Sequence, residues 1–222
     1  MKNRLSKAQA AYENALENVE NLHVKISEGN NKLGAIPSVS LIPVMDCGNC
    51  GNCAKSCYDL RNDFIYKEVI NTRAINSAIY HEDPERYFKE IDGYLDYRFP
   101  RAFRFHIGGD IQDKWYLDKM CEIARKHKDT KFLAFTKMFD VCNEYLDEGN
   151  VIPENMHILF SGWLGLKMNN RHGFPEAHPI FESGTSAPEG TLLCTGNCTE
   201  CLKEDRLCWS IGKGQAIGFL AH

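Results

Sequence analysis

The sequence contains no apolar run that approaches the roughly 20 residues of a membrane-spanning helix, so we expect no membrane partner. Residues 1–7 carry neither an apolar signal core nor a cleavage site, which predicts a cytoplasmic protein with reduced thiols. A net charge of -4 and a pI near 6.1 give no strong positive field, so nucleic acid is not an expected partner. P-loop, dinucleotide-binding and serine-elbow motifs are also absent, which excludes the chemistries that depend on them.

Cysteine, in contrast, is abundant, and eight of the ten cysteines fall into two tight groups. The first group is Cys47, Cys50, Cys53 and Cys57; the second group is Cys194, Cys198, Cys201 and Cys208. The first has the C-x2-C-x2-C-x3-C spacing by which bacterial ferredoxins bind an iron–sulfur cluster. We therefore predict that these eight residues are metal ligands and that the first group contributes to a [4Fe-4S] cluster.

The second group leaves more than one interpretation open. Its thiols either complete the first site, form a second cluster, or bind structural zinc through four thiolates. A Gly-Asn-Cys sequence occurs in both groups, ending at Cys50 and Cys53 in the first and at Cys198 in the second, which favours ligand loops over coincidence. Cys121 and Cys142 each stand alone in a helical pattern and are predicted to be buried free thiols.

Helical and extended patterns alternate along the chain. An amphipathic helix is expected within residues 1–23, helices after Cys57 and from Pro84, and further helices at 114–126 and 141–146. Extended segments are expected within 24–44 and at 102–107, 131–136 and 156–160. Such βα units predict an α/β fold with a parallel sheet, barrel-like as in a partial or distorted TIM barrel. We expect one domain over 1–222, with a βα core at 24–168 and an irregular lid plus the second cysteine group at 169–222.

Side chains with possible chemistry lie where the predicted strands end. These are the first cysteine group, His106 with Gly108-Gly109-Asp110, Thr136-Lys137 and Ser161-Gly162-Trp163. The carboxyl ends of parallel strands meet at one edge, so we expect a single site for a small-molecule substrate. His106 and Asp110 are the candidate catalytic residues; the alternatives are a core histidine and a helix cap.

Several of these stretches resemble the phage "gene product 88" family. They are residues 26–37, the Cys53-Ala54-Lys55-Ser56-Cys57-Tyr58 motif, Phe105-His106-Ile107-Gly108-Gly109-Asp110, and the run of cysteines that ends in Cys208-Trp209. The resemblance covers roughly residues 26–209. It implies a phage or prophage origin, the bacterial host cytoplasm as location, and a shared cysteine-rich site, but no particular reaction.

A cysteine loop after the first strand, followed by a strand that ends in Gly108-Gly109-Asp110, also resembles the layout of radical SAM enzymes. In those enzymes the Gly-Gly-acidic motif lies beside the methionine moiety of SAM. The resemblance implies that Gly108 and Gly109 bind a cofactor and that SAM is that cofactor. Those enzymes typically carry C-x3-C-x2-C, whereas this loop has C-x2-C-x2-C-x3-C.

The residues together predict an iron–sulfur enzyme. An iron that lacks a thiolate ligand acts as a Lewis acid toward a carbonyl or a water, so hydrolysis or hydration of a small substrate is expected, with His106 or Asp110 moving the proton. Two alternatives remain: a radical SAM-like enzyme, and a non-catalytic accessory protein that binds zinc or iron–sulfur clusters.

Overall fold

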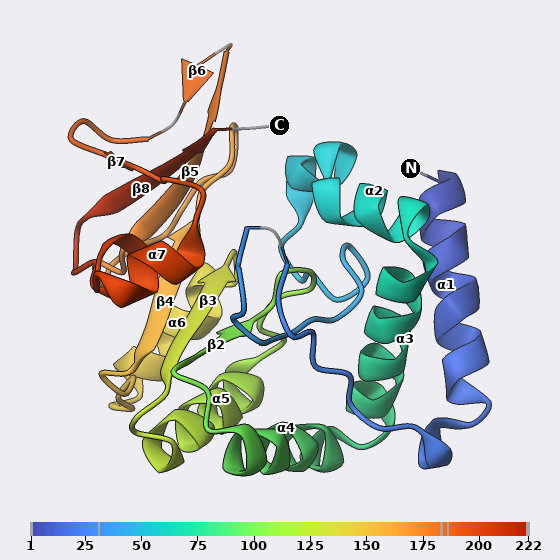
Figure 1. The fold of residues 1–222 in the computed structure, drawn as a ribbon. Helices are drawn as coiled ribbons and strands as arrows, with labels where there is room; N and C mark the ends of the chain where they lie inside the picture. The colour runs from blue at the N-terminus through green and yellow to red at the C-terminus, as the bar shows by residue number, and fades with distance from the viewer. Residues whose placement is uncertain (1, 31, 183, 186, 221–222) are drawn as a thin grey trace.

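The structure of the protein is a computed structural model that describes residues 2–30, 32–182, 184–185 and 187–220 (Figure 1). An eight-stranded sheet runs through it in the order β1-β2-β3-β4-β5-β8-β7, and β6 pairs with β5. All pairs are parallel except β5–β6. The strands are β1 (Ser38–Val39), β2 (Ala102–Phe105), β3 (Lys131–Thr136), β4 (Met156–Ser161), β5 (Glu176–Phe181), β6 (Gly184–Thr185), β7 (Leu192–Leu193) and β8 (Ala216–Leu220).

Helices precede, connect and follow these strands. The α-helices are α1 (Lys2–Leu16), α2 (Tyr58–Ile65), α3 (Lys67–Glu82), α4 (Pro84–Arg98), α5 (Lys114–Lys126), α6 (Phe139–Asp147) and α7 (Cys198–Lys203). Three short 3₁₀ helices are η1 (Val19–Asn21), η2 (Gly51–Ser56) and η3 (Leu207–Trp209). As expected, Asp83 caps α4: its side chain accepts a hydrogen bond from the Arg86 amide, and Pro84 occupies the first turn.

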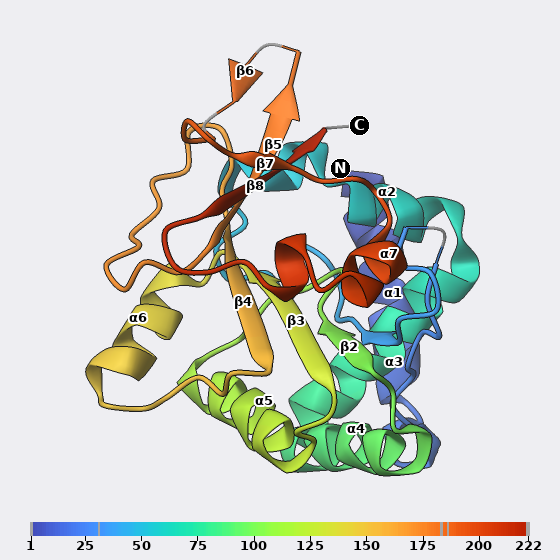
Figure 2. The ribbon, with the colours of Figure 1, turned by 60° about the vertical axis from the view of Figure 1, so that its left-hand side comes forward.

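The sheet is buried on both faces, because successive residues of a strand point to opposite sides. In β3, Phe132 and Ala134 pack against helices α3 to α6, whereas Leu133 packs against the C-terminal segment. That segment, residues 192–215, passes in front of β3 and β4 in Figure 2. On the other side of the molecule, α1 lies along the outer face of α3 (Figure 1).

The prediction of an α/β fold with a parallel sheet is confirmed, and so are the buried thiols of Cys121 and Cys142. Closure into a barrel is not observed. The pairings run from β1 at one edge to β7 at the other, and among the described residues no pairing joins these two edges. An open parallel sheet still brings its carboxyl ends to one edge, which is what the predicted site requires.

The described part of residues 169–222, for which we predict an irregular lid and the second cysteine group, contains strands β5 to β8, which extend the sheet. β5 and β8 pair over five residues, although β5 contains Pro179. Proline removes one backbone donor and therefore fits where a strand lacks a partner on one side. β5 pairs with β4 only at Glu176 and Ala177, so Pro179 lies beyond that ladder and the proline is tolerated. Among the described residues, no helix is long and apolar enough to cross a membrane.

Candidate metal centre and adjacent cavity

The first cysteine group lies on the loop that follows β1, partly within η2. The Cys50 thiol interacts with both Cys47 and Cys53, and this interaction lowers the pKa of each. The pKa of Cys53 falls to about 6, also helped by the Lys137 ammonium. Burial raises the pKa of Cys57 to about 11. Cys50 thus lies between Cys47 and Cys53 and interacts with both, and the charges of Cys53 and Cys47 also contribute to the raised pKa of Cys57.

Backbone amides point at two of the sulfurs. The Val44 amide donates to Cys47 Sγ at 3.3 Å, and the Leu60 amide donates to Cys57 Sγ at 3.4 Å. Val44 has a φ of 73°, a left-handed conformation that a β-branched residue rarely adopts. Strain of this kind concentrates at functional sites, and N–H···S bonds tune the thiolates that hold metal clusters. The loop is therefore organised around its sulfurs.

Asp46, directly before Cys47, fixes the start of the loop. Its carboxylate is buried and accepts hydrogen bonds from Ser77 Oγ (2.6 Å), His81 Nε2 (2.7 Å) and the Ile42 amide (3.1 Å). Its carbonyl oxygen accepts a bond from the Asp110 amide at 2.8 Å. The same residue thereby attaches the cysteine loop to α3 and to the Gly-Gly-Asp turn.

The turn Gly108-Gly109-Asp110 packs closely against the chain around Leu41. A Cβ at Gly109, whose φ is 80°, would lie 2.7 Å from the Leu41 side chain, and one at Gly108 would lie 2.9 Å from the Arg73 guanidinium. The buried Asp110 carboxylate accepts bonds from Thr136 Oγ1 (2.6 Å), the Ile111 amide (2.7 Å) and the Lys137 amide (2.8 Å). Asp110 is not the cap of α5, because Asp113 takes that position. It orients the end of β3.

His106 lies in the core, at the end of β2, with only 2% of its surface exposed. Its ring centroid is 5.4 Å from that of Tyr116, and neither ring nitrogen has a hydrogen-bond partner among the described residues. Burial lowers the pKa of His106 to about 4, so the imidazole is neutral at neutral pH. Its backbone is left-handed, with a φ of 58°. The sequence left two interpretations of His106 open, an acid–base residue and a core histidine, and its position in the structure is that of a core histidine.

Lys137 reaches the cysteine loop from the end of β3. Its ammonium donates to Ser161 Oγ at 3.1 Å, lies 5.9 Å from the Trp163 ring centroid, and interacts with the Cys53 thiol. Its carbonyl oxygen accepts a bond from the Asn49 side chain. Of the groups expected to meet at the strand ends, cysteine, lysine, serine and indole lie together here, whereas the expected His106 is buried in the core.

A cavity of about 220 Å³ opens beside these groups. Its walls are Cys50, Gly51, Asn52, Cys53, Trp163, Gly165 and Leu166. Thiols form one wall and an indole with an aliphatic side chain forms the other, so a small molecule placed here would touch the cysteine loop directly. His106 does not line this cavity.

The spacing of the sulfurs bears on which metal they suit. A single zinc ion with Zn–S bonds of ~2.3 Å in a tetrahedron needs sulfurs ~3.8 Å apart. Among the described residues, the only three side chains of ligand type whose donor atoms lie within 4.8 Å of one another are Asp92, Asp96 and His127. The sulfurs of each cysteine group are thus gathered but spread more widely than one ion requires. A multinuclear cluster, which places each thiolate on a different iron, fits this spread.

The second cysteine group lies on the C-terminal segment that covers the sheet. The Gly196 amide donates to Cys194 Sγ at 3.4 Å, and Thr195 Oγ1 lies 3.3 Å from Cys201 Sγ. Burial raises the pKa of Cys208 to about 12, with Cys194 and Cys198 adding to the rise. The thiol–thiol interactions of each group stay within that group.

Comparison with known proteins gives one family. The sequence profile of the family described as Gene product 88 matches residues 3–163. The chain belongs to the gene product 88 family. The resemblance seen in the sequence covered roughly residues 26–209. The profile match differs from it at both ends: it includes nearly all of α1, and it stops before the second cysteine group. No curated protein and no solved structure matches the chain significantly.

Two ion pairs of this gene product 88 chain, one buried and one with a partly exposed histidine, were not found by sequence reasoning. His81 binds Asp46, and Arg73 Nη2 binds Asp59 Oδ1 at 2.9 Å with both side chains below 8% exposed. Each pair links α3 to one end of the cysteine loop. The available signal was the position of the two carboxylates, Asp46 one residue before the first ligand and Asp59 two residues after the last.

Proposed function

We propose that the first cysteine group holds a [4Fe-4S] cluster and that the protein is an enzyme that hydrolyses or hydrates a small substrate beside it. The observation that carries this proposal is the position of the four thiols. They lie at the carboxyl edge of a parallel sheet, where Cys50 and Cys53 line a cavity of about 220 Å³ and Cys53 interacts with the Lys137 ammonium, which donates to Ser161. That edge is where α/β enzymes collect their chemistry.

The residues present fit such a cluster. Four thiols with ferredoxin spacing, two amide donors to sulfur and a loop fixed by Asp46 are the features that hold and orient cluster ligands. A bound cluster with one iron free of thiolate would supply a Lewis acid at the cavity. Three of the four cysteines would then bind the cluster, either Cys47, Cys53 and Cys57 or Cys50 in place of one of these, and the choice stays open because Cys50 and Cys53 both line the cavity.

The chain's own groups have distinct tasks in this proposal. The Lys137 ammonium, held by Ser161, binds the developing negative charge or a carboxylate of the substrate. Trp163 and Leu166 contact its apolar part and exclude water. Asp110 keeps Lys137 in place through the Lys137 amide. His106, neutral and enclosed, would act as an acceptor for a proton only if the core beside it opens.

The test begins with anaerobic purification. We expect a brown protein with broad absorption near ~400 nm, because thiolate-to-iron charge transfer absorbs there. Iron and sulfide should be present in equal amounts, as in a [4Fe-4S] cluster. Activated esters and hydratable acids are then screened with and without SAM. Turnover that needs the iron-loaded protein but not SAM supports the proposal. A colourless protein with stoichiometric zinc contradicts the cluster, and reductive cleavage of SAM would favour a radical enzyme over a Lewis-acid enzyme.

A further inference from the structure

The C-terminal segment covers one face of the sheet with very little regular structure. Its only helices are α7, of six residues, and η3, of three. The opposite face is covered by α3 to α6, helices of 9 to 16 residues. Short elements bury too little apolar surface to hold a layer by packing alone, and proteins commonly add a metal or disulfides in such places.

Four thiols lie within this thin layer. Cys201 and Cys208 are buried, at 5% and 8% exposed, and pack with Trp209 against Leu133 and Leu159 of the sheet. Cys194 and Cys198 are half-buried and join the same apolar cluster. All four carry free thiols, and the charges of Cys194, Cys198 and Cys201 reach Cys208. The layer thus has the ligands of a complete four-thiolate site.

Local geometry turns the chain around these sulfurs. Gly196 has a φ of 81° and donates its amide to Cys194 Sγ, while Asp205 and Leu207, at 48° and 54°, bring the chain back so that Cys208 faces α7. Non-glycine residues with a left-handed backbone are uncommon. Two of them within three positions mark a strained turn, which needs stabilising interactions from the surrounding structure. The Trp209 indole adds a bond to the Cys198 carbonyl at 3.2 Å.

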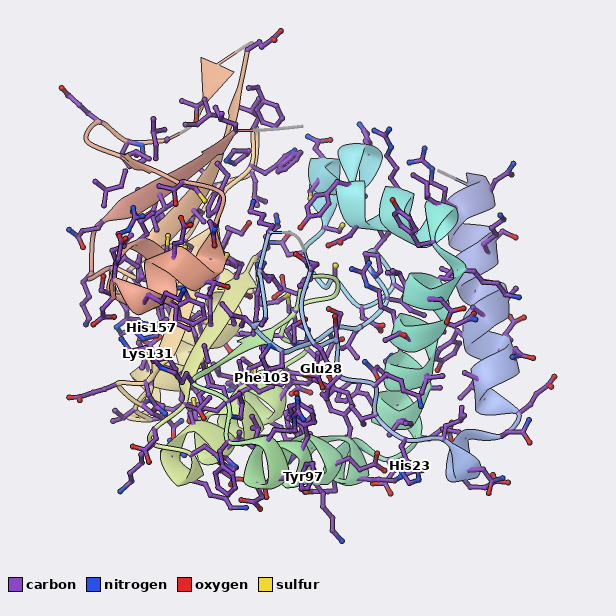
Figure 3. The ribbon with its side chains drawn as sticks, viewed as in Figure 1. His23, Glu28, Tyr97, Phe103, Lys131 and His157 are labelled. Carbon is purple, nitrogen blue, oxygen red and sulfur yellow. The ribbon has the colours of Figure 1, made fainter. Side chains whose placement is uncertain are left out.

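The layer is fastened to the rest of the molecule around the same cysteines. The Cys198 amide donates to the Lys32 carbonyl at 3.1 Å, and Thr199 Oγ1 donates to the Leu33 carbonyl at 2.9 Å. Lys131 of β3 binds Asp205. Figure 3 shows Lys131 and His157 next to each other below α7, on the strands that the segment covers. None of the residues in these contacts lines the cavity beside Cys50 and Cys53.

We propose that Cys194, Cys198, Cys201 and Cys208 form a second metal centre, separate from the first, with all four thiolates bound and no open position, whose role is to hold the C-terminal layer on the sheet. A thiophilic occupant is required: a second iron–sulfur cluster fits the present spread of the sulfurs, whereas zinc would need them to move closer together. Because Cys201 and Cys208 are buried and a fully thiolate-bound metal has no open position for a substrate, this centre takes no part in the reaction.

The experiment measures iron, sulfide and zinc per chain after anaerobic purification, in the wild type and in two double variants. Cys47→Ser with Cys53→Ser should lose the first centre and keep the second. Cys194→Ser with Cys208→Ser should lose the second centre and show a Tm lower by at least ~5 °C. Cys121→Ala is the control: it removes a buried core thiol, so it should lower the Tm without changing the metal content.

The wild type alone provides a second readout in case the C-terminal double variant fails to fold. Removing metal with a chelator should expose residues 192–215 to proteolysis before the helical face is cleaved. Eight irons per chain would identify a second cluster, and four irons with one zinc would identify zinc; both support the proposal. The proposal is overturned if the Cys47→Ser and Cys53→Ser double variant contains no metal at all. A disulfide within the second cysteine group of the wild type would also overturn the proposal.

Discussion

At the scale of single residues, the two left-handed non-glycine residues beside the cysteine loop have different consequences. Val44 uses its φ of 73° to aim an amide at Cys47, so its strain is coupled to a ligand. His106 uses its φ of 58° to turn the chain from β2 into the Gly-Gly-Asp turn and buries its ring in the core. The sequence placed His106 at the mouth of the site because it follows a strand. Backbone conformation, which the sequence does not display, decided that the ring points into the core.

The first prediction concerns the pH dependence of stability. The pKa of His106 is about 4 in the folded protein and about 6.5 when unfolded, so between these values only the unfolded chain binds the proton. We therefore expect the free energy of unfolding to fall as pH drops from 6.5 to 4, by up to about 1.4 kcal/mol per pH unit. His106→Asn, which tolerates a positive φ, should lose most of this slope. Denaturant unfolding of both proteins at several pH values measures it; equal slopes would contradict the burial argument.

The second prediction concerns Lys137. Replacing it with Met keeps the length of the side chain but removes the charge that faces Ser161 and Cys53. If the ammonium stabilises charge on the substrate, turnover in the esterase and hydratase screen should fall roughly 10²–10³-fold. Lys137→Arg, which keeps the positive charge, should retain part of the turnover.

The absorbance near ~400 nm separates this role from one in cluster binding. We expect Lys137→Met to keep the wild-type absorbance while losing turnover. Lys114→Met is the matched control, because Lys114 pairs with Glu148 on the surface and should affect neither measurement. Loss of colour together with turnover would make Lys137 a residue that supports the thiolates instead.

At the scale of helices and strands, prediction succeeded where the local pattern was regular. The helix at 114–126 and the strand at 131–136 have the bounds that the sequence indicated, because capping and alternation are local signals. β5 and β8 were missed. Their pairing partners are distant in sequence, and Pro179 with the surrounding glycines is typical of a loop when no neighbouring strand is known. Tertiary pairing, not propensity, makes these segments strands.

The site shows the same division. Cysteine spacing predicted which thiols gather, and strand ends predicted that Lys137, Ser161 and Trp163 meet them. The anchors of the cysteine loop on α3 are contacts between residues 14 to 35 positions apart, and no local pattern encodes them. Only the position of a carboxylate near each end of the cysteine group pointed to them.

The third prediction tests the anchor between the cysteine loop and α3. Asp46→Ala removes the acceptor of the buried Ser77 hydroxyl and of the partly exposed His81 ring, and leaves the Ile42 amide with Ser77 Oγ alone, so it should lower the free energy of unfolding by about 2–3 kcal/mol. It should also reduce the iron retained after anaerobic purification, because the first ligand loses its fixed position. Asp83→Ala, which removes the exposed cap of α4, should cost only about 1 kcal/mol and keep full iron. Retention of full iron in Asp46→Ala would mean that the thiols alone position the loop.

At the scale of the whole molecule, the sheet separates two environments for thiolates. The first group lies at the carboxyl edge, where a cavity gives small molecules access to Cys50 and Cys53. The second group lies on a face of the sheet, with two of its four thiols under 10% exposed. If both groups bind metal as proposed, access differs even though the ligands are chemically alike. An open position is needed for reaction, whereas a closed one contributes to folding.

The fourth prediction follows from this difference in access. When the anaerobically purified protein is exposed to air or to a chelator, metal should leave in two phases. In the wild type, the loss of metal in the fast phase should abolish turnover without changing the far-UV circular dichroism. The Cys47→Ser and Cys53→Ser double variant should show no fast phase. The slow phase should coincide with a loss of ordered structure, because release from the closed centre requires the C-terminal layer to leave the sheet. A single phase in which colour, turnover and structure disappear together would show that the two cysteine groups act as one site.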